Sequence, residues 1–295
     1  MNIIKFLDQL SFEGGSKEDL EVLSSRREAF TKLSGFSKKM AISAIPTGIL
    51  ASMPGMLSAK SSAENTMEVL NFALTLEYLE YEFYQKASES GVYNEQKVVF
   101  DQIKDHEEAH VAFLTETINA MEGGSAVAKP TFDFTGGKGG TGPFDPFNDY
   151  AQFLALSQAF EDTGVRAYKG QAAKLVSDSM SNLILTAALS IHGVEARHAS
   201  MVRRLRGQKG WITGEDTSVP EAALAVYQAG DPADQFPSEA NVTQAGVNLE
   251  AAFVGNVPNI DRDSIQEAFD EPLDANVVMG TGTVYDIVGL FIVPE

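Results

Sequence analysis

Apolar residues recur at steps of three and four positions in four separate stretches of the chain. This is the spacing of one face of an α-helix, and the stretches cover residues 64–86, 94–121, 150–168 and 184–205. A segment rich in glycine and proline, residues 122–147, separates the second stretch from the third. A connection of this length lets two helices run parallel. The pattern predicts an all-α fold, a four-helix bundle with one long crossover.

The fourth predicted helix has a recognisable end. Its last turn, Arg203–Arg206, is basic, and Gly207 follows. Cations are favourable near a helix C-terminus, and glycine commonly ends a helix. Beyond it, residues 208–295 are mostly irregular, apart from a short helix predicted near 264–269 and an apolar end at 284–293. We expect this irregular C-terminal tail to be an extension packed on the bundle, at one end of it or against a second subunit.

Each predicted helix places a glutamate within its apolar face. A buried carboxylate is unfavourable unless a cation or hydrogen bonds compensate it. A solvated run of surface charge would not fall on the core side of all four helices. The alternative is a bundle in which these polar residues only bond one another. The four residues are Glu77, Glu107, Glu161 and Glu195.

The second and fourth helices add a histidine three positions after the glutamate, at His110 and His198. Residues at i and i+3 share a helix face, so a carboxylate and an imidazole can reach the same ion. The order glutamate, then Glu-x-x-His, occurs twice, which predicts two helix hairpins related by a pseudo-twofold axis. Known di-iron and di-manganese bundles use this donor set. Four carboxylates neutralise two divalent cations, and the ligand types suit Fe or Mn, with Zn as an alternative.

The segment HEEAH, which begins at His106, also matches the H-E-x-x-H motif of zinc proteases. In this remote alternative His106 and His110 would bind one zinc ion, and Glu107 would be the general base of a zinc metalloprotease. The extended protease motif is absent, because Phe113 and Glu116 stand where it requires glycine and histidine. The protease hypothesis also leaves the glutamates of the other three helices unexplained.

The crossover contains GKGGTG, residues 137–142, which matches the G-x-G-x-x-G motif of dinucleotide-binding loops. That function requires a strand before the glycines and a helix directly after them. Here Pro143-Phe144-Asp145-Pro146 follows instead. We therefore interpret the motif as part of a flexible crossover and not as a nucleotide site.

The chain resembles the bacterial ferritin-like domain family related to plant desiccation-related proteins. The resemblance is carried by LNFALTLEYLEYEFY (70–84), DHEEAHVAFL (105–114), QAFEDTGVRAYKG (158–170) and VEARHASMVRRLRG (194–207). It implies a ferritin-like bundle over residues 64–207 that holds two metal ions. Carried onto matching positions, it makes Glu77 and Glu161 terminal ligands and Glu107 and Glu195 bridging ligands, and it assigns one ion each to His110 and His198. A shared fold does not fix the chemistry.

Residues 1–63 differ from the rest of the chain and form a predicted leader. Arg26-Arg27 precedes a weakly apolar run, 40–57, and small residues follow up to Ala59. This resembles a twin-arginine export signal, although two residues rather than one separate the arginines from Phe30. The apolar run is too short and too interrupted for a membrane span. The pattern predicts a periplasmic or exported protein, and a retained cytoplasmic protein is the alternative.

Composition narrows the classes of partner. The net charge is −19, which disfavours nucleic acid and anionic membranes. There is no cysteine, which excludes disulfides, zinc–cysteine sites and iron–sulfur clusters. Histidine chemistry must use four residues, and the roles of His106 and His192 stay open. The expected partners are metal ions, a second copy of the chain in a homodimer, and an external electron donor if the protein is redox-active.

Two functions from different classes fit these observations. The first is an oxidoreductase that uses a di-iron or di-manganese site on O2, peroxide or Fe(II). Tyr81 and Tyr84 follow Glu77 closely and could pass electrons, although tyrosines at helical spacing are more often core residues. The second is a metal-binding or stress-protective protein without catalysis. Metal content, Fe(II) oxidation and peroxide consumption distinguish the two.

Overall fold

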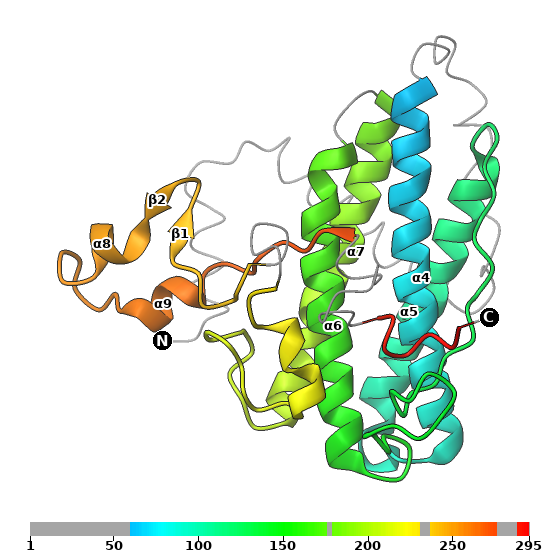
Figure 1. Cartoon of the computed structure of the whole chain (residues 1–295), viewed down its shortest axis with the longest axis horizontal. Coiled ribbons are helices and arrows are strands. Elements are labelled where there is room, and N and C mark those ends of the chain that lie inside the picture. The colour runs from blue at the N-terminus through cyan, green and yellow to red at the C-terminus, as the bar shows by residue number, and fades with distance from the viewer. Residues whose placement is uncertain (1–59, 176–178, 231–236, 276–287, 295) are drawn as a thin grey trace, which may run out of the picture. The chain divides into compact units, whose positions relative to one another are not determined.

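The protein is an all-α bundle of four long helices in the computed structural model (Figure 1). The structure describes residues 60–175, 179–230, 237–275 and 288–294, all within one compact unit, Gly55–Glu295. The predicted export signal lies outside these residues. The long helices are α4 (Lys60–Ser90), α5 (Lys97–Ala120), α6 (Tyr150–Ala172) and α7 (Ser179–Leu205).

The helices pack as two hairpins. Helix α4 packs mainly on α5, and α6 packs mainly on α7, while the two hairpins meet chiefly through α4 and α6. This arrangement confirms the all-α bundle predicted from the apolar periodicity. Among the described helices, none combines the length and the apolar character needed to cross a membrane.

The ends of the helices follow from local chemistry. The Asp149 side chain accepts hydrogen bonds from the backbone N–H groups of Ala151 and Gln152, which caps the N-terminus of α6. Gly207 has a φ of +75°, and the next N–H bonds back to the carbonyl of Arg203 at 2.9 Å, which closes α7 where predicted. The second helix begins later than predicted, because a 3-10 turn, η1 (Asn94–Gln96), precedes it. Another, η2 (Ala173–Leu175), follows α6.

The crossover between α5 and α6 is packed, which differs from the flexible segment expected from its glycines. Phe132, Phe134 and Phe144 are buried in the bundle core, and Phe132 forms an antiparallel bridge with Ile292. At Gly142 a side chain would overlap the backbone of the facing turn. The glycines therefore permit tight turns that insert aromatic rings into the core.

The core consists of two apolar clusters, one on each side of the predicted ligands. Along α4 the first cluster includes Leu70 and Leu74, and the second includes Leu79 and Phe83. Glu77 lies between these two sets of residues. Apolar packing above and below removes water from the level of the bundle where the glutamates lie.

The C-terminal extension covers the outer face of α6. Arg166 of α6 is fully buried, and its side chain donates hydrogen bonds to the backbone carbonyls of Val226, Pro237 and Glu271. Phe291 packs edge-on against Phe160 with 5.0 Å between ring centres. Because both faces are covered, α6 is buried along most of its length. The extension contains η3 (Glu221–Val226), β1 (Thr243–Gln244), β2 (Val247–Asn248), α8 (Leu249–Phe253) and α9 (Arg262–Gln266), the last close to the predicted short helix.

Candidate metal centre

The structure brings all six predicted ligands together inside the bundle. The four glutamates have no solvent exposure, and the two histidines are nearly buried. Helices α4 and α6 contribute one glutamate each, and α5 and α7 contribute a glutamate and a histidine each. The six residues are Glu77, Glu107, His110, Glu161, Glu195 and His198.

The ligand atoms form two overlapping groups, and within each group one atom from every residue lies within 4.8 Å of the others. Two glutamates belong to both groups, as expected for carboxylates shared between two ions. The first group is Glu77, Glu107, His110 and Glu195. The second group is Glu107, Glu161, Glu195 and His198.

The two histidines have equivalent surroundings. In the first group, Nδ1 of His110 lies 3.1 Å from Glu77, 3.0 Å from Glu107 and 3.1 Å from Glu195. The matching nitrogen of His198 lies 2.9 Å from Glu107, 3.2 Å from Glu161 and 3.6 Å from Glu195. Glu107 and Glu195 direct one oxygen to each histidine. The geometry therefore repeats the pseudo-twofold order of the sequence.

Several of these close atoms make no hydrogen bond. A ring nitrogen carries at most one proton, so it cannot bond three carboxylates at once. The lone pairs of the carboxylate oxygens and of the imidazole nitrogen converge on shared points instead. Burying an acceptor without a hydrogen-bond partner lowers the stability of the fold. A cation at each point would satisfy them, so the donor set fits two metal ions. The unbonded atoms are Oε1 of Glu107, Oε2 of Glu161, both oxygens of Glu195 and Nδ1 of His198.

The comparison with protein families agrees with this geometry. The family model described as the ferritin-like domain matches residues 65–208. These residues form a ferritin-like domain. No curated protein matches the chain.

The ferritin-like domain has two buried tyrosines that connect its hairpins. The Tyr84 hydroxyl donates a hydrogen bond to Glu161 at 2.5 Å, and the Tyr168 hydroxyl donates one to Glu77. Each tyrosine lies seven residues after the glutamate of its own helix and bonds the glutamate of the other hairpin. The seven-residue spacing is visible in the sequence. That each tyrosine bonds the glutamate of the other hairpin, rather than that of its own helix, is visible only in the structure. Tyr81, by contrast, is part-exposed and bonds Glu108.

The electrostatics of the domain reflect an excess of carboxylates. Burial raises the pKa of Glu161 to about 7, with partial relief from His198. Burial and then the charge of Glu195 raise the pKa of Glu107. Although burial alone would lower it, the Glu161 charge and neighbouring carboxylates raise the pKa of His198 to about 12. The pKa of His110 rises for the same kind of reason, led among the charges by Glu77. In the metal-free chain, imidazolium ions therefore supply the positive charge.

A fifth buried glutamate, Glu80, lies beside the six ligands and was not predicted from the sequence. It is only 2% exposed, and burial followed by the charge of Glu195 raises its pKa well above the ordinary value. A side chain added at Gly164 would lie 3.2 Å from Oε1 of Glu80, so the glycine leaves room for this carboxylate. Glu80 lies three residues after Glu77 on α4, and Gly164 lies three residues after Glu161 on α6. The Glu77-x-x-Glu80 spacing was the available signal.

His106 lies outside both groups of converging atoms. Its Nδ1 lies 2.9 Å from Nε2 of His198, on a helix of the other hairpin. His110 instead belongs to the first group together with Glu107. The two histidines of HEEAH thus do not converge on one point, which a zinc protease would require. His192 is part-buried, and its Nδ1 has no hydrogen-bond partner.

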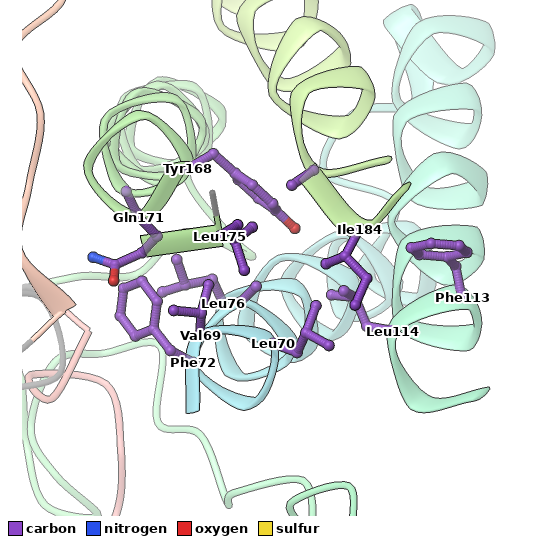
Figure 2. Close-up of a pocket in the computed structure, with 13 residues that line it drawn as sticks. Val69, Leu70, Phe72, Leu76, Phe113, Leu114, Tyr168, Gln171, Leu175 and Ile184 are labelled. Atoms are coloured by element: carbon purple, nitrogen blue, oxygen red, sulfur yellow. The ribbon is translucent and has the colours of Figure 1, made fainter. Parts of the chain in front are cut away.

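An apolar cavity of about 20 Å³ is lined by side chains from all four long helices (Figure 2). Leu70 of α4, Leu114 of α5 and Ile184 of α7 contribute to its wall, together with Tyr168 of α6. The same Tyr168 bonds Glu77 through its hydroxyl group, so this side chain lies between the cavity and the first ligand group. The cavity is large enough for a water-sized molecule and too small for an organic substrate.

Proposed function

We propose that the ferritin-like domain binds two Fe or Mn ions and supports redox chemistry on O2, peroxide or Fe(II). The observation that supports this most strongly is the set of converging buried carboxylate and imidazole atoms, several of which make no hydrogen bond. Such atoms remain costly to the fold until a cation compensates them. Oxygen and nitrogen ligands suit iron and manganese, and they also accept zinc.

The residues divide between the two ions according to their groups. Glu77 and His110 would hold one ion, Glu161 and His198 the other, and the glutamates common to both groups would be shared. When bound, two redox-active ions exchange electrons with small oxygen species, or are themselves oxidised if they arrive as Fe(II). Zn would fill the same positions without redox chemistry.

The chain contributes orientation and exclusion of water. The hydroxyl groups of Tyr84 and Tyr168 each donate a hydrogen bond to a terminal glutamate, which fixes one carboxylate oxygen and leaves the other directed at the ligand group. Apolar clusters on both sides keep bulk water away from this level of the bundle. The apolar 20 Å³ cavity beside Tyr168 has room only for a small apolar reactant such as O2.

The decisive experiment loads purified chain with Fe(II) or Mn(II) and measures metal content first. We expect about two ions per chain, from the count of two ligand groups. Glu116→Gln, an exposed glutamate on α5, is the matched control for Glu107→Gln on the same helix. The control should retain both ions, whereas Glu107→Gln should lose most of its metal. Metal contents near zero in the unaltered chain under all loading conditions would refute the proposal.

Turnover separates the enzyme from a non-catalytic metal-binding or stress-protective protein. An oxidoreductase should oxidise Fe(II) under O2, or consume peroxide, repeatedly when an external electron donor is supplied. Two bound ions without repeated turnover would favour the non-catalytic alternative.

Mass measurement in solution would test the homodimer.

We also propose that the protein is exported to the periplasm. The Arg26-Arg27 pair and the apolar run after it support export to the periplasm. Replacing both arginines with lysine should leave the full-length chain in the cytoplasm. Finding the unaltered, unprocessed chain only in the cytoplasm would contradict export.

A further inference from the structure

The side chains of His106 and His198 meet edge to edge across the two hairpins. Nδ1 of His106 is 2.9 Å from Nε2 of His198, the ring centres are 5.2 Å apart, and the ring planes differ by 12°. The separation of the centres is close to the nitrogen–nitrogen distance plus two ring radii. The nitrogens therefore lie between the rings, which is the arrangement of an in-line N–H···N hydrogen bond rather than of face-to-face stacking.

The contact decides where the protons lie on both rings. Nδ1 of His198 points to the second ligand group, and a nitrogen that binds a cation must present a lone pair. The proton of a neutral His198 then has to be on Nε2, which makes this nitrogen the donor. Nδ1 of His106 must be the acceptor, so His106 carries its own proton on Nε2. One hydrogen bond thus fixes the tautomer and the orientation of the ligand ring.

The first ligand group lacks a matching contact. His106 lies four residues before His110, and the position four before His198 is Val194, which has no polar side chain. Within the described part of the chain, no side chain bonds Nε2 of His110. The six ligands therefore follow pseudo-twofold symmetry, but the residues around them do not, because His198 has a side-chain partner at Nε2 and His110 has none among the residues that the structure describes.

We propose that His106 is a positioning residue that accepts a hydrogen bond from His198, prepares its Nδ1 for metal, and makes the second ligand group bind metal more tightly than the first. This inference rests on the proposed function. Partners of metal-bound histidines contribute about 10–100-fold to metal affinity in general. His106 would have this effect on one ion alone, since only His198 is in contact with it.

The test uses the full chain and calorimetric titration with Zn(II), which reports affinity without any redox activity. His106→Leu removes the acceptor at similar size, and His106→Asn keeps an oxygen near the position of Nδ1. We expect His106→Leu to bind two ions with one affinity lowered about 10–100-fold. His106→Asn should recover most of this loss. His192→Ala is the control, because this part-buried histidine of α7 lies outside both ligand groups.

Double variants identify which ion is affected. His106→Leu should lower the remaining affinity of His110→Ala, which retains the second ligand group. It should not change that of His198→Ala, in which the bonded ring is already gone. Nitrogen-15 spectra of the Zn(II)-loaded chain should show His198 protonated at Nε2, and this assignment should become less uniform in His106→Leu. Circular dichroism confirms that each variant is folded.

The outcomes separate the two proposals. Absence of Zn(II) binding by the unaltered chain would refute the proposed di-metal function and this inference with it. Binding of two ions with affinities unchanged in His106→Leu would refute the positioning role alone. An equal loss in His106→Leu and His106→Asn would also refute it, because it would mean that shape rather than the accepted hydrogen bond matters.

Discussion

Two buried polar clusters lie against helix α6, and they differ in how their charges are compensated. The arginine cluster, on the outer face, consists of Arg166, Asp162, Arg203, Asp216 and Glu239. Arg166 pairs with Glu239 at 2.6 Å, and Arg203 pairs with Asp216 at 2.7 Å and with Asp162. The ligand cluster, on the inner face, consists of the six predicted ligands and Glu80. Its carboxylates have only imidazole rings to oppose them.

The two clusters also differ in how completely their polar atoms are hydrogen-bonded. In the arginine cluster Asp162 also accepts a hydrogen bond from Tyr227 at 2.6 Å, and the guanidinium of Arg166 reaches backbone carbonyls. One oxygen of Glu239 alone lacks a partner there. In the ligand cluster most of the unbonded atoms belong to carboxylates that face one another. Buried charge by itself therefore does not indicate a metal site, whereas buried acceptors in excess of cations and donors do.

The largest expected effect is in the arginine cluster. Arg166→Ala leaves the buried Glu239 carboxylate without its opposing charge and removes the side-chain donor from three backbone carbonyls. Breaking a buried pair in this way costs about 3–5 kcal/mol of unfolding free energy, measurable by denaturant unfolding. Arg204→Ala, an exposed arginine on α7, should change stability by less than about 0.5 kcal/mol. The loss in Arg166→Ala should be the same with and without metal, and a loss seen only in metal-loaded chain would mean that the two clusters are coupled.

The next effect belongs to the ligand cluster and depends on metal. A ligand that binds only the folded chain stabilises it by about 2.7 kcal/mol at 100 times its Kd. Zn(II) or Mn(II) at about 100 times the Kd of the tighter site should therefore raise the unfolding free energy of the unaltered chain by about this amount. Glu107→Ala and Glu195→Ala should lose most of the gain to a similar extent, because both glutamates are shared. Glu116→Gln should keep it, and equal gains in all four proteins would place the metal elsewhere.

The sequence predicted the ligand cluster far better than the arginine cluster, and the reason is local periodicity. Glu77 and Glu107-x-x-His110 lie within regular helices, where spacing alone assigns a face. Arg166 was also on a predicted helix, but its partner Glu239 comes from an irregular segment far along the chain. Such segments have no period from which a contact follows. For the same reason, the hydrogen bonds of Tyr84 and Tyr168 to glutamates of the other hairpin could not be predicted from helical spacing.

Acidity should separate metal-free from metal-loaded chain. Glu161 has a native pKa of about 7, raised by burial from its ordinary 4.5, so the folded chain holds its proton longer than the unfolded chain. The stability that depends on this proton is present below pH 4.5 and is lost as pH rises to 7. The raised pKa of His198, about 12, extends the loss above pH 6.5. Glu195 opposes the trend only below pH 4.5, since the adjacent His110 and His198 outweigh the effect of burial and lower its pKa.

Metal reverses this dependence, because ligands must lose protons before they bind cations. Metal-free chain should lose on the order of 1 kcal/mol between pH 5 and pH 7, whereas excess Zn(II) should stabilise the chain more at pH 7 than at pH 5. Calorimetry in buffers of different ionisation enthalpy should also detect proton release on binding. Parallel trends with and without metal would contradict the assignment of these groups as ligands.

The smallest effect concerns Glu80, where the ligand cluster departs from twofold symmetry. Glu80→Gln keeps the size of the side chain and removes an acidic group whose ionisation is opposed by burial and by the neighbouring carboxylates. At pH 7 we expect the metal-free chain to gain about 1 kcal/mol in unfolding free energy, and the gain should shrink as pH falls toward 4.5, the ordinary pKa of the carboxyl group in the unfolded chain. Gly164→Ala is the companion variant, because its added methyl group meets the end of the Glu80 side chain at 3.2 Å. Alanine gains up to about 1 kcal/mol over glycine within a helix, so Gly164→Ala should stabilise Glu80→Ala, which lacks the contacting atoms, more than it stabilises the unaltered chain. An equal loss in both backgrounds would show that the space at Gly164 serves the packing of α4 on α6 and not the carboxylate of Glu80.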